Sequence, residues 1–359
     1  MSTQTDTATA EMLYRLLPYA AMSPSVHNTQ PWLFVVDNGQ VRLFADRTRR
    51  LAVIDPDDRQ LTISCGAALF HLRLAMRYFG FADEVTFFPK TNPDLLAIVC
   101  AREHREATLE ERLLFRAIAL RHTYRRRFEK QALPESLVSG LQSAAVGQGG
   151  ELRVIDSETS RSMVAALIAE GDHIQSADEM FRDDLVKWLR VRPISRRRDG
   201  IPTGALGTPR AISPAMPAYL RCANWGARRA ARDEKLALGS PSLAMLWTER
   251  DEPLDWLRAG EALAALLLLA AVNGVHASFF NQPIEVPRLR NRLRLALEVR
   301  GFPQMLMRLG FAPEAKRTPR RPLTEAAVNA SSLALPSPPD RSGDPGNVRI
   351  RDQRPDSFD

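Results

Sequence analysis

The segment from Ser23 to Trp32 is the most specific polar string in the chain, and it reads Ser-Pro-Ser-Val-His-Asn-Thr-Gln-Pro-Trp. It joins an expected amphipathic helix to an expected strand, so its side chains lie where backbone and ligand can approach one another. Ser25, Asn28 and Gln30 offer short donors and acceptors that suit the edge of a planar polar ligand. The alternative is that they only cap and turn the chain, as Ser and Asn do in many loops.

Two basic strings could bind an anion. The first is Arg121-His-Thr-Tyr-Arg-Arg-Arg127, in which Arg121, Thr123 and Arg125 can converge on one phosphate. Charge-assisted hydrogen bonds of that kind are about twice as strong as neutral ones. The second is Lys316-Arg-Thr-Pro-Arg-Arg321, a basic arm that follows an apolar, strand-like run. Taken alone, each string is more typical of a solvated surface or loop than of a ligand site.

The rest of the composition excludes several kinds of protein. The three cysteines, Cys65, Cys100 and Cys222, are too few and too widely spaced for a disulfide framework or a CxxC-type metal site. We expect no metal ligands. The N-terminal residues lack the pattern of a secretory signal, and the longest apolar run, Ala262–Val272, is about half of what a membrane span needs. A cytoplasmic protein without a membrane partner is the simplest expectation.

The chain is basic, with 49 Lys and Arg against 42 Asp and Glu and a net charge of +7. Such a balance suits a nucleic acid, a membrane surface or an anionic small molecule, although a coding bias towards arginine also explains it. Aromatic residues make up only 7% of the chain, and no nucleic-acid-binding signature is present. We therefore expect no nucleic-acid partner.

The elements around these strings show a sequence repeat. Two glycine-led helical patterns, Gly66–Gly80 and Gly260–Gly274, share the form G-x-A-L-x-x-L-x-L with a second glycine fourteen residues after the first. Their apolar spacing indicates buried helices, with the second glycine as the stop signal. A second pair repeats a helix followed by a strand, at 13–22 with 32–36 and at 135–146 with 151–155.

These repeats predict two homologous α+β halves. We place the first at 1–108 and the second at 109–329. The second half carries about 70 more residues than the first before its glycine-led helix, and this insertion, about 175–251, is rich in proline. Long insertions of this kind are often lids over binding sites. The last residues, 330–359, are rich in Pro, Ser, Gly and Asp, and we expect them to be disordered.

Together, the Ser23–Trp32 segment and the two basic strings resemble motifs of the nitroreductase superfamily of FMN-dependent flavoproteins. The resemblance covers roughly residues 12–325, apart from the insertion. It implies a fold in which the FMN lies at a dimer interface. The early basic motif and the C-terminal arm hold its phosphate and ribityl chain, and the Pro-Ser-x-x-Asn segment of the other subunit borders the flavin ring.

Carried over residue by residue, the resemblance implies the following FMN-binding residues: Pro24, Ser25, His27, Asn28, Gln30, Arg121, Thr123, Arg125, Arg317 and Arg320. The loop Ser278-Phe-Phe-Asn-Gln282 falls where family members approach the flavin N5. Its sequence matches the family loop poorly, so Ser278, Phe279 and Asn281 are weaker candidates. Because a flavin itself carries out hydride transfer, we expect no catalytic acid, base or nucleophile in the protein.

The departures from the family pattern are informative. The first half has the Pro-Ser-x-x-Asn array but no basic motif before it, whereas the second half has the basic motif but reads Val-Gly-Gln-Gly-Gly at 146–150 in place of the array. This complementary loss predicts a nitroreductase-like fold duplicated in one chain, an intramolecular pseudo-dimer with one intact FMN site and a lid. The chain is then a monomeric pseudo-dimer or a weak homodimer.

This arrangement looks like the double-domain branch related to the mycobacterial protein Acg. It implies an FMN-binding oxidoreductase that takes hydride from NAD(P)H and reduces nitroaromatics, quinones or similar small electrophiles. The alternative is a catalytically silent protein that sequesters FMN beneath its lid. The sequence leaves both functions open.

Overall fold

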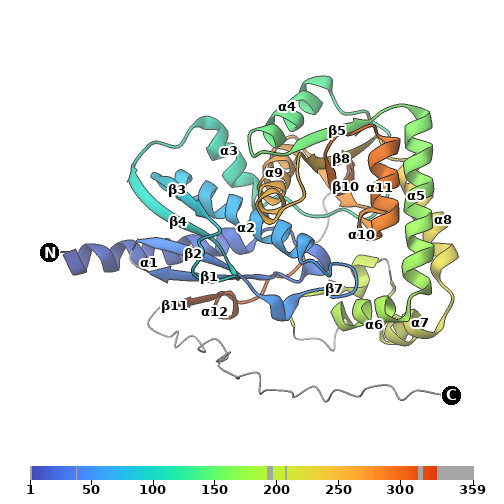
Figure 1. Ribbon diagram of the computed structural model, residues 1–359, viewed down its shortest axis with the longest axis horizontal. Coiled ribbons are helices and arrows are strands. Elements are labelled where there is room, and N and C mark those ends of the chain that lie inside the picture. Colours follow the sequence, from blue (N-terminus) through green and yellow to red (C-terminus); the bar gives the residue numbers. More distant parts are fainter. Residues whose placement is uncertain (1, 38, 192–196, 207, 314–317, 330–359) are drawn as a thin grey trace, which may run out of the picture.

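The computed structural model describes residues 2–37, 39–191, 197–206, 208–313 and 318–329 (Figure 1). The segment expected to be disordered, 330–359, lies outside the described residues. The helices are α1 (Ser2–Ala21), α2 (Arg59–Tyr78), α3 (Leu109–Ala117), α4 (Glu135–Val146), α5 (Glu158–Ala177), α6 (Glu179–Trp188), α7 (Met216–Cys222), α8 (Gly226–Leu238), α9 (Pro253–Val272), α10 (Gln282–Glu285), α11 (Pro287–Ala296) and α12 (Leu323–Ala326).

The strands are β1 (Trp32–Asp37), β2 (Gln40–Ala45), β3 (Phe81–Phe87), β4 (Leu95–His104), β5 (Glu151–Ile155), β6 (Leu189–Arg190), β7 (Ile201–Pro202), β8 (Ser242–Thr248), β9 (Val275–Phe279), β10 (Phe302–Phe311) and β11 (Ala327–Asn329). The expected combination of helices and strands is confirmed, and the pairs in the two larger sheets are antiparallel except for β1–β11.

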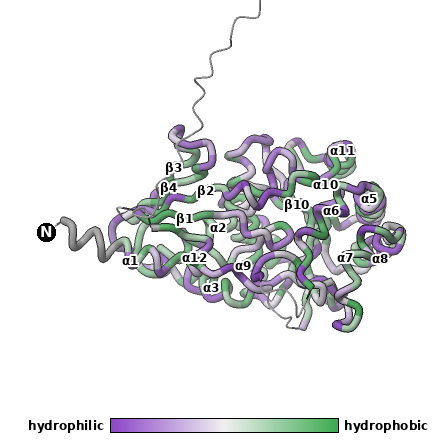
Figure 2. The backbone as a smooth tube through the Cα atoms, turned by 90° about the horizontal axis from the view of Figure 1, so that it is seen from below, coloured by the Kyte–Doolittle hydropathy of each residue, from purple (hydrophilic) through white to green (hydrophobic). Residues whose placement is uncertain are grey.

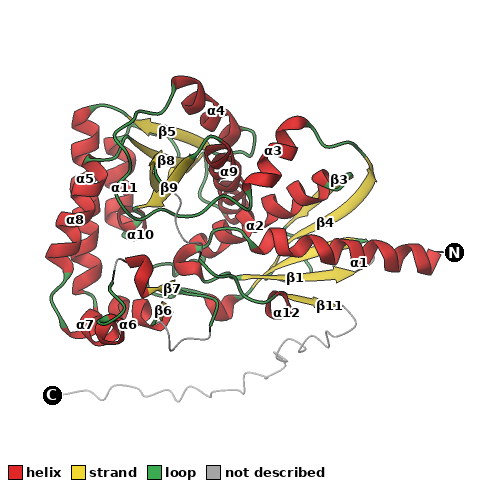
Figure 3. Ribbon diagram, turned by 180° about the vertical axis from the view of Figure 1, so that it is seen from behind, coloured by secondary structure: helices red, strands yellow, loops and turns green. Residues whose placement is uncertain are grey.

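Two sheets lie on either side of the helix pair α2 and α9 (Figure 3). The first has the order β11-β1-β2-β4-β3 and the second the order β5-β8-β10-β9. If β11 is left aside and the four strands of each sheet are counted along the chain, both sheets have the same strand order, 1-2-4-3. All neighbouring strands in this order are antiparallel. The helix–strand pair α4–β5 matches α1–β1, and α9 matches α2. The sequence repeats thus fall on equivalent elements.

The repeated glycines mark the contact between α2 and α9. Gly66 and Gly260 lie inside their helices, which begin earlier than the glycine-led pattern suggested. A Cβ on Gly66 would lie 2.0 Å from the carbonyl oxygen of Leu257, and one on Gly260 would lie 2.0 Å from that of Ile63. Only glycine permits this approach, which brings the backbones of the two helices into direct contact.

The insertion lies between the first two strands of the second sheet. Two residues, 38–39, separate β1 from β2, whereas residues 156–241 separate β5 from β8 and contain α5, α6, α7, α8 and the short parallel pair β6–β7. The expected range 175–251 thus also contains β8, which is a central, buried strand of the sheet. The insertion packs on the first half through one apolar cluster: Leu51, Ile54, Phe181, Leu185, Leu189, Ile201, Leu220 and Trp225.

The C-terminal arm returns to the first half. After β10, residues 318–329 run along the first half, and β11 pairs in parallel with β1, with Phe34 opposite Ala327. Figure 2 shows a largely hydrophobic β1 and many hydrophilic residues along the outer helices α5 and α8. Among the described residues, every helix is too short or too polar to cross a lipid bilayer.

Candidate functional site

A cavity of about 450 Å³ lies where the first half, the second half and the insertion meet. This volume falls in the range of ~300–1,000 Å³ that is typical of cofactor and substrate pockets. Three of the segments singled out in the sequence contribute to its wall: the loop at 22–28, the basic string at 121–125 and the loop at 278–282. Most of the remaining wall comes from α5 to α8, β10 and the C-terminal arm, with smaller contributions from α2, α9, α10 and β7.

The loop between α1 and β1 holds an unusual backbone conformation. His27, Asn28 and Gln30 have φ angles of 48°, 55° and 52°, in the left-handed region that non-glycine residues rarely occupy. Ser25 Oγ accepts a hydrogen bond from the Gln30 backbone N–H at 2.9 Å, and the Val26 backbone N–H donates to Ser64 Oγ at 3.4 Å. Strain of this kind persists where the surroundings fix it, and it concentrates at ligand sites.

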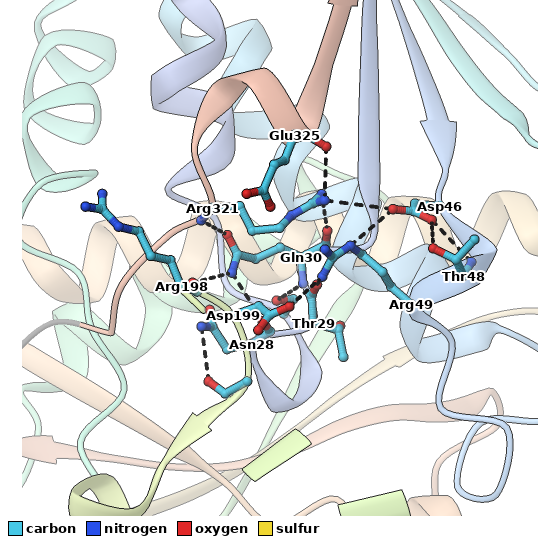
Figure 4. Close-up of polar contacts among 12 residues, drawn as sticks. Asn28, Thr29, Gln30, Asp46, Thr48, Arg49, Arg198, Asp199, Arg321 and Glu325 are labelled. Carbon is cyan, nitrogen blue, oxygen red and sulfur yellow. Dashed lines mark hydrogen bonds and ion pairs between the residues drawn. The ribbon is translucent and has the colours of Figure 1, made fainter. Parts of the chain in front are cut away.

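Figure 4 shows that much of the polar array in this loop is used within the protein. Gln30 is buried, its Nε2 donates to the carbonyls of Asn28 and Arg198, and its Oε1 accepts from the Arg321 backbone N–H. Gln30 does not line the cavity. Asn28 does, but its Nδ2 donates to the Gly200 and Pro319 carbonyls. The array therefore locks the loop to the insertion and the C-terminal arm. Pro24, Ser25 and His27 also line the cavity.

The basic string is held as an extended segment beside β9. Thr123 forms a parallel bridge with Ala277, and the Tyr124 backbone N–H donates to the Ala277 carbonyl at 2.9 Å. An extended backbone sends alternate side chains to the same side, so Arg121, Thr123 and Arg125 all reach the cavity wall. His122 lines it as well.

Arg121 is a buried cation without an acidic partner in the described part of the chain. The residue is 7% exposed, and its Nε has no hydrogen-bond partner there. Burial, together with repulsion from Arg320 and Arg125, lowers the pKa of Arg121 to about 9. Arg125 is open to the cavity yet enclosed by protein, and burial lowers its pKa too. These guanidiniums repel one another, and no carboxylate among the described residues forms an ion pair with them.

Arg320 completes this group from the C-terminal arm. Its Nη1 donates to Asn28 Oδ1 at 3.2 Å and its Nη2 to the Met22 carbonyl at 3.1 Å, which brings it beside the first loop. Its Nε has no partner among the described residues, and burial lowers its pKa to about 10. Arg317, the other expected residue of the arm, lies outside the described residues. We call Arg121, Arg125 and Arg320 the cation cluster.

His27 faces the cavity as a neutral side chain. Burial and the nearby positive charges of Arg229 and Arg125 lower its pKa to about 4. Its Nδ1 has no hydrogen-bond partner in the residues the structure describes. At neutral pH the imidazole that lines the cavity is therefore uncharged.

The loop after β9 also reaches the cavity. Ser278, Phe279 and Asn281 all line it. Asn281 is fixed by its neighbours, because its Oδ1 accepts from the Leu306 backbone N–H at 3.0 Å and its Nδ2 lies 3.5 Å from Gln60 Oε1. Phe279 packs against the core of the second half. The structure thus brings the weaker candidates to the same cavity as the stronger ones.

Sequence reasoning expected the insertion to form a lid, but it named none of the residues in the wall that the insertion supplies. Its charged members are Arg228, Arg229, Arg232 and Asp233, and its larger apolar members are Phe181, Leu185, Leu220 and Trp225. Arg308 and Glu285 of the second half line the cavity as well. One signal was available for Arg308, since it is the single charged residue in the apolar run 302–311. The insertion residues carry no comparable signal.

The arrangement can hold an elongated ligand with an anionic end and a planar body. The cation cluster supplies the charge, and the strained loop and the 278–281 loop supply flat walls and backbone groups. No group of three His, Cys, Asp or Glu side chains suited to a metal ion occurs within the described ranges.

The chain is similar over most of its length to curated proteins of Mycobacterium tuberculosis. It is 31% identical over 323 residues to the uncharacterized protein Rv3127, covering 87% of this chain and 91% of that one. It is 29% identical to the putative NAD(P)H nitroreductase Rv3131, covering 88% and 91%, and 28% identical to the putative NAD(P)H nitroreductase acg, covering 88% and 95%. No family model matches the chain.

Solved structures similar to the chain include nitroreductases. The FMN-dependent nitroreductase NfnB of Mycobacterium smegmatis, solved with NADPH, is 17% identical with a TM-score of 0.38, covering 60% of this chain and 96% of that one. A nitroreductase of Desulfitobacterium hafniense with bound FMN is 11% identical with a TM-score of 0.34, covering 59% and 95%.

Proposed function

The chain belongs to the nitroreductase superfamily, in its acg-like branch, and from this premise we propose that it is an FMN-binding, NAD(P)H-dependent oxidoreductase. Its substrates are small electrophiles such as nitroaromatics or quinones. One FMN binds in the cavity between the two halves. No nucleic acid or membrane takes part.

The cation cluster is the observation that carries this proposal. Arg121 is buried and Arg320 is half-buried, neither forms an ion pair with a carboxylate in the described part of the chain, and an unpaired charge shielded from water is strongly unfavourable. A dianionic phosphate at the cluster would satisfy all three guanidiniums. The residues present therefore fit the phosphate end of FMN, and the cavity volume fits a cofactor.

Each part of the wall then has a role. Arg121, Arg125 and Arg320 hold the phosphate, and Thr123 donates one hydrogen bond. Pro24, Ser25 and His27 border the planar ring, while Gln30 and the Asn28 amide keep the loop in its strained shape. Ser278, Phe279 and Asn281 lie along the opposite wall. When bound, the flavin supplies the hydride-transfer chemistry.

We also propose that the chain is a duplicated fold, with halves at 1–108 and 109–329 acting as an intramolecular pseudo-dimer. The shared strand order and the α2–α9 contact at Gly66 and Gly260 support this. Because the strained loop comes from the first half and the basic string from the second, one site forms per chain. The protein is then complete as a monomer.

A second candidate function is FMN sequestration, and the position of the insertion favours it. Phe181, Leu185 and Trp225 line the cavity while packing in the apolar cluster on the first half. Arg49 Nη1 donates to Asp199 Oδ2 at 2.9 Å, which fixes the insertion further. Because these contacts hold the insertion against the first half, its wall leaves a nicotinamide less room to reach the flavin.

The experiment that separates these functions is an anaerobic titration. Purified protein with bound flavin is mixed with NADPH or NADH, and the visible flavin absorption is followed. Bleaching, followed by recovery when a nitroaromatic or quinone is added, supports the oxidoreductase. Flavin that stays oxidised with both donors supports sequestration and rejects the enzymatic proposal.

A further inference from the structure

A second group of arginines lines the cavity, apart from the cation cluster. Arg228, Arg229 and Arg232 come from α8 of the insertion, and Arg308 comes from β10. Arg229 is already paired, since its Nε lies 2.7 Å from Asp172 Oδ1 and its guanidinium lies 5.5 Å from the centre of the Trp225 ring. Arg232 Nε lies 2.9 Å from Asp233 Oδ1, but its side chain is 56% exposed, which leaves its terminal nitrogens able to reach a ligand.

Arg308 is the unusual member of this group. It is 1% exposed in the middle of an apolar strand. Its Nη2 donates to the Arg126 carbonyl at 2.8 Å, whereas its Nε and Nη1 have no hydrogen-bond partner in the described part of the chain. The rings of Phe128 and Phe280 lie 4.5 and 5.5 Å from its guanidinium carbon. No carboxylate forms an ion pair with it among the described residues.

The charges around Arg308 do not compensate it. Burial lowers the pKa of Arg308 to about 10. The negative charge of Asp233 raises this pKa and the positive charge of Arg232 lowers it, but both effects are smaller than that of burial. The Asp233 carboxylate already interacts with Arg232 and with Gln282 Nε2, which lies 3.4 Å from its Oδ2. The pKa of Arg121, in contrast, responds to Arg320 and Arg125. The charges that shift the pKa of Arg308 thus come from other residues than those that shift the pKa of Arg121.

Apolar and aromatic side chains lie on the same wall as this second group. Phe181, Leu185, Leu220 and Trp225 all line the cavity from the insertion. A flat apolar surface beside guanidiniums suits a planar ring that carries a negative substituent, because arginine binds carboxylate and phosphate with two parallel hydrogen bonds.

We propose that the insertion end of the cavity is a subsite for an anionic group on the molecule that meets the flavin, with Arg232 and Arg308 as its cationic walls. The group is a carboxylate of an aromatic electron acceptor or a phosphate of the nicotinamide donor. This inference rests on the proposed function, and it narrows the substrate class to anionic ligands.

The test compares matched ligands that differ only in charge. Calorimetry measures the dissociation constants of para-nitrobenzoate and neutral para-nitrobenzamide, and of NADP⁺ and NAD⁺, for the purified protein. The wild type is expected to bind the more anionic member of at least one pair about tenfold more tightly, the effect of one charge-assisted contact. R232Q and R308Q are expected to bring that ratio towards one, and R308K, which keeps the charge but not the paired hydrogen bonds, to lower it less than R308Q does.

The control is R288Q, an exposed arginine on α11 that is expected to leave both ratios unchanged. A change confined to the nitrobenzoate pair identifies the acceptor as the anionic molecule, and one confined to the nucleotide pair identifies the donor. Ratios unaltered in both R232Q and R308Q would overturn the subsite. Flavin content, measured separately on the same samples, reports on the proposed function, because calorimetry detects ligand binding whether or not flavin is present.

Discussion

Replacing Arg121 with methionine should change FMN affinity and apoprotein stability in opposite directions. Methionine keeps most of the side-chain length but removes the buried charge. The pKa of Arg121 is lowered to about 9, which places it about 3.5 pH units below the ordinary value. At ~1.4 kcal/mol per pH unit, the buried charge disfavours the folded apoprotein by up to roughly 4–5 kcal/mol. Removing even part of this free-energy cost should stabilise the R121M apoprotein by about 1 kcal/mol or more.

The same substitution should weaken FMN binding. A hydrogen bond to a charged group contributes ~1.5–3 kcal/mol, which corresponds to a roughly 10- to 150-fold rise in the dissociation constant. Flavin-free protein is prepared for both variants, urea unfolding gives its stability, and quenching of flavin fluorescence gives the FMN affinity. R127M is the matched control, because Arg127 is an exposed residue of the same string that does not line the cavity.

Two results would refute the reasoning. If R121M bound FMN as tightly as the wild type, the phosphate would lie elsewhere. If the R121M apoprotein were less stable than the wild type, Arg121 would have a partner that stabilises the fold, and the cation cluster would not be a site that awaits an anion.

Three further predictions concern the fold around the site. G260A should destabilise the protein by about 1–3 kcal/mol or more in urea unfolding, because its Cβ would lie 2.0 Å from the Ile63 carbonyl oxygen. The control G204A should change stability little, because a Cβ at Gly204 would enter open space. Equal stabilities of the two variants would mean that α2 and α9 do not meet at Gly260. Q30A should lower the free energy of unfolding by about 1–3 kcal/mol and also lower FMN occupancy, because it leaves the Arg321 backbone N–H without its acceptor. A normal flavin content and stability would show that the loop does not depend on this amide. Acid should destabilise the protein through His71, because burial lowers the pKa of this residue to about 3 in the folded state, whereas the unfolded state protonates it near pH 6.5. The free energy of unfolding should therefore fall as the pH drops below 6.5, by about 2 kcal/mol at pH 5. In urea unfolding measured at pH 6.5 and pH 5, H71Q should reduce this pH dependence.

Local patterns in the sequence predicted much of the fold. The helix at 135–146 and the strand at 151–155 lie where helical periodicity and the glycines between them placed them. Gly80 and Gly274 end their helices with φ angles of 91° and 70°, as stop signals do. What local patterns could not show is why Gly66 and Gly260 are glycines, because that depends on a contact between segments almost 200 residues apart.

The candidate site was predictable to the extent that its chemistry is local in sequence. The basic string and the Ser23–Trp32 segment meet at one cavity. Gln30 was expected at the ligand, yet its amide is consumed by Arg198 and Arg321, partners that only the tertiary structure brings near. The arginines of α8 were missed for the same reason, since a charged helix in an insertion is typical of a solvated surface.

The central claim is that one chain forms one FMN site from two unlike halves, with the cation cluster at its phosphate end. The most direct measurement is the FMN stoichiometry of purified protein reconstituted with excess cofactor, from its visible absorption and its protein concentration. We predict one FMN per chain in the wild type, and less than half of that in the double variant R121M/R320M at the same cofactor concentration. A chain that takes up none or two, or a double variant that stays fully loaded, would contradict the account.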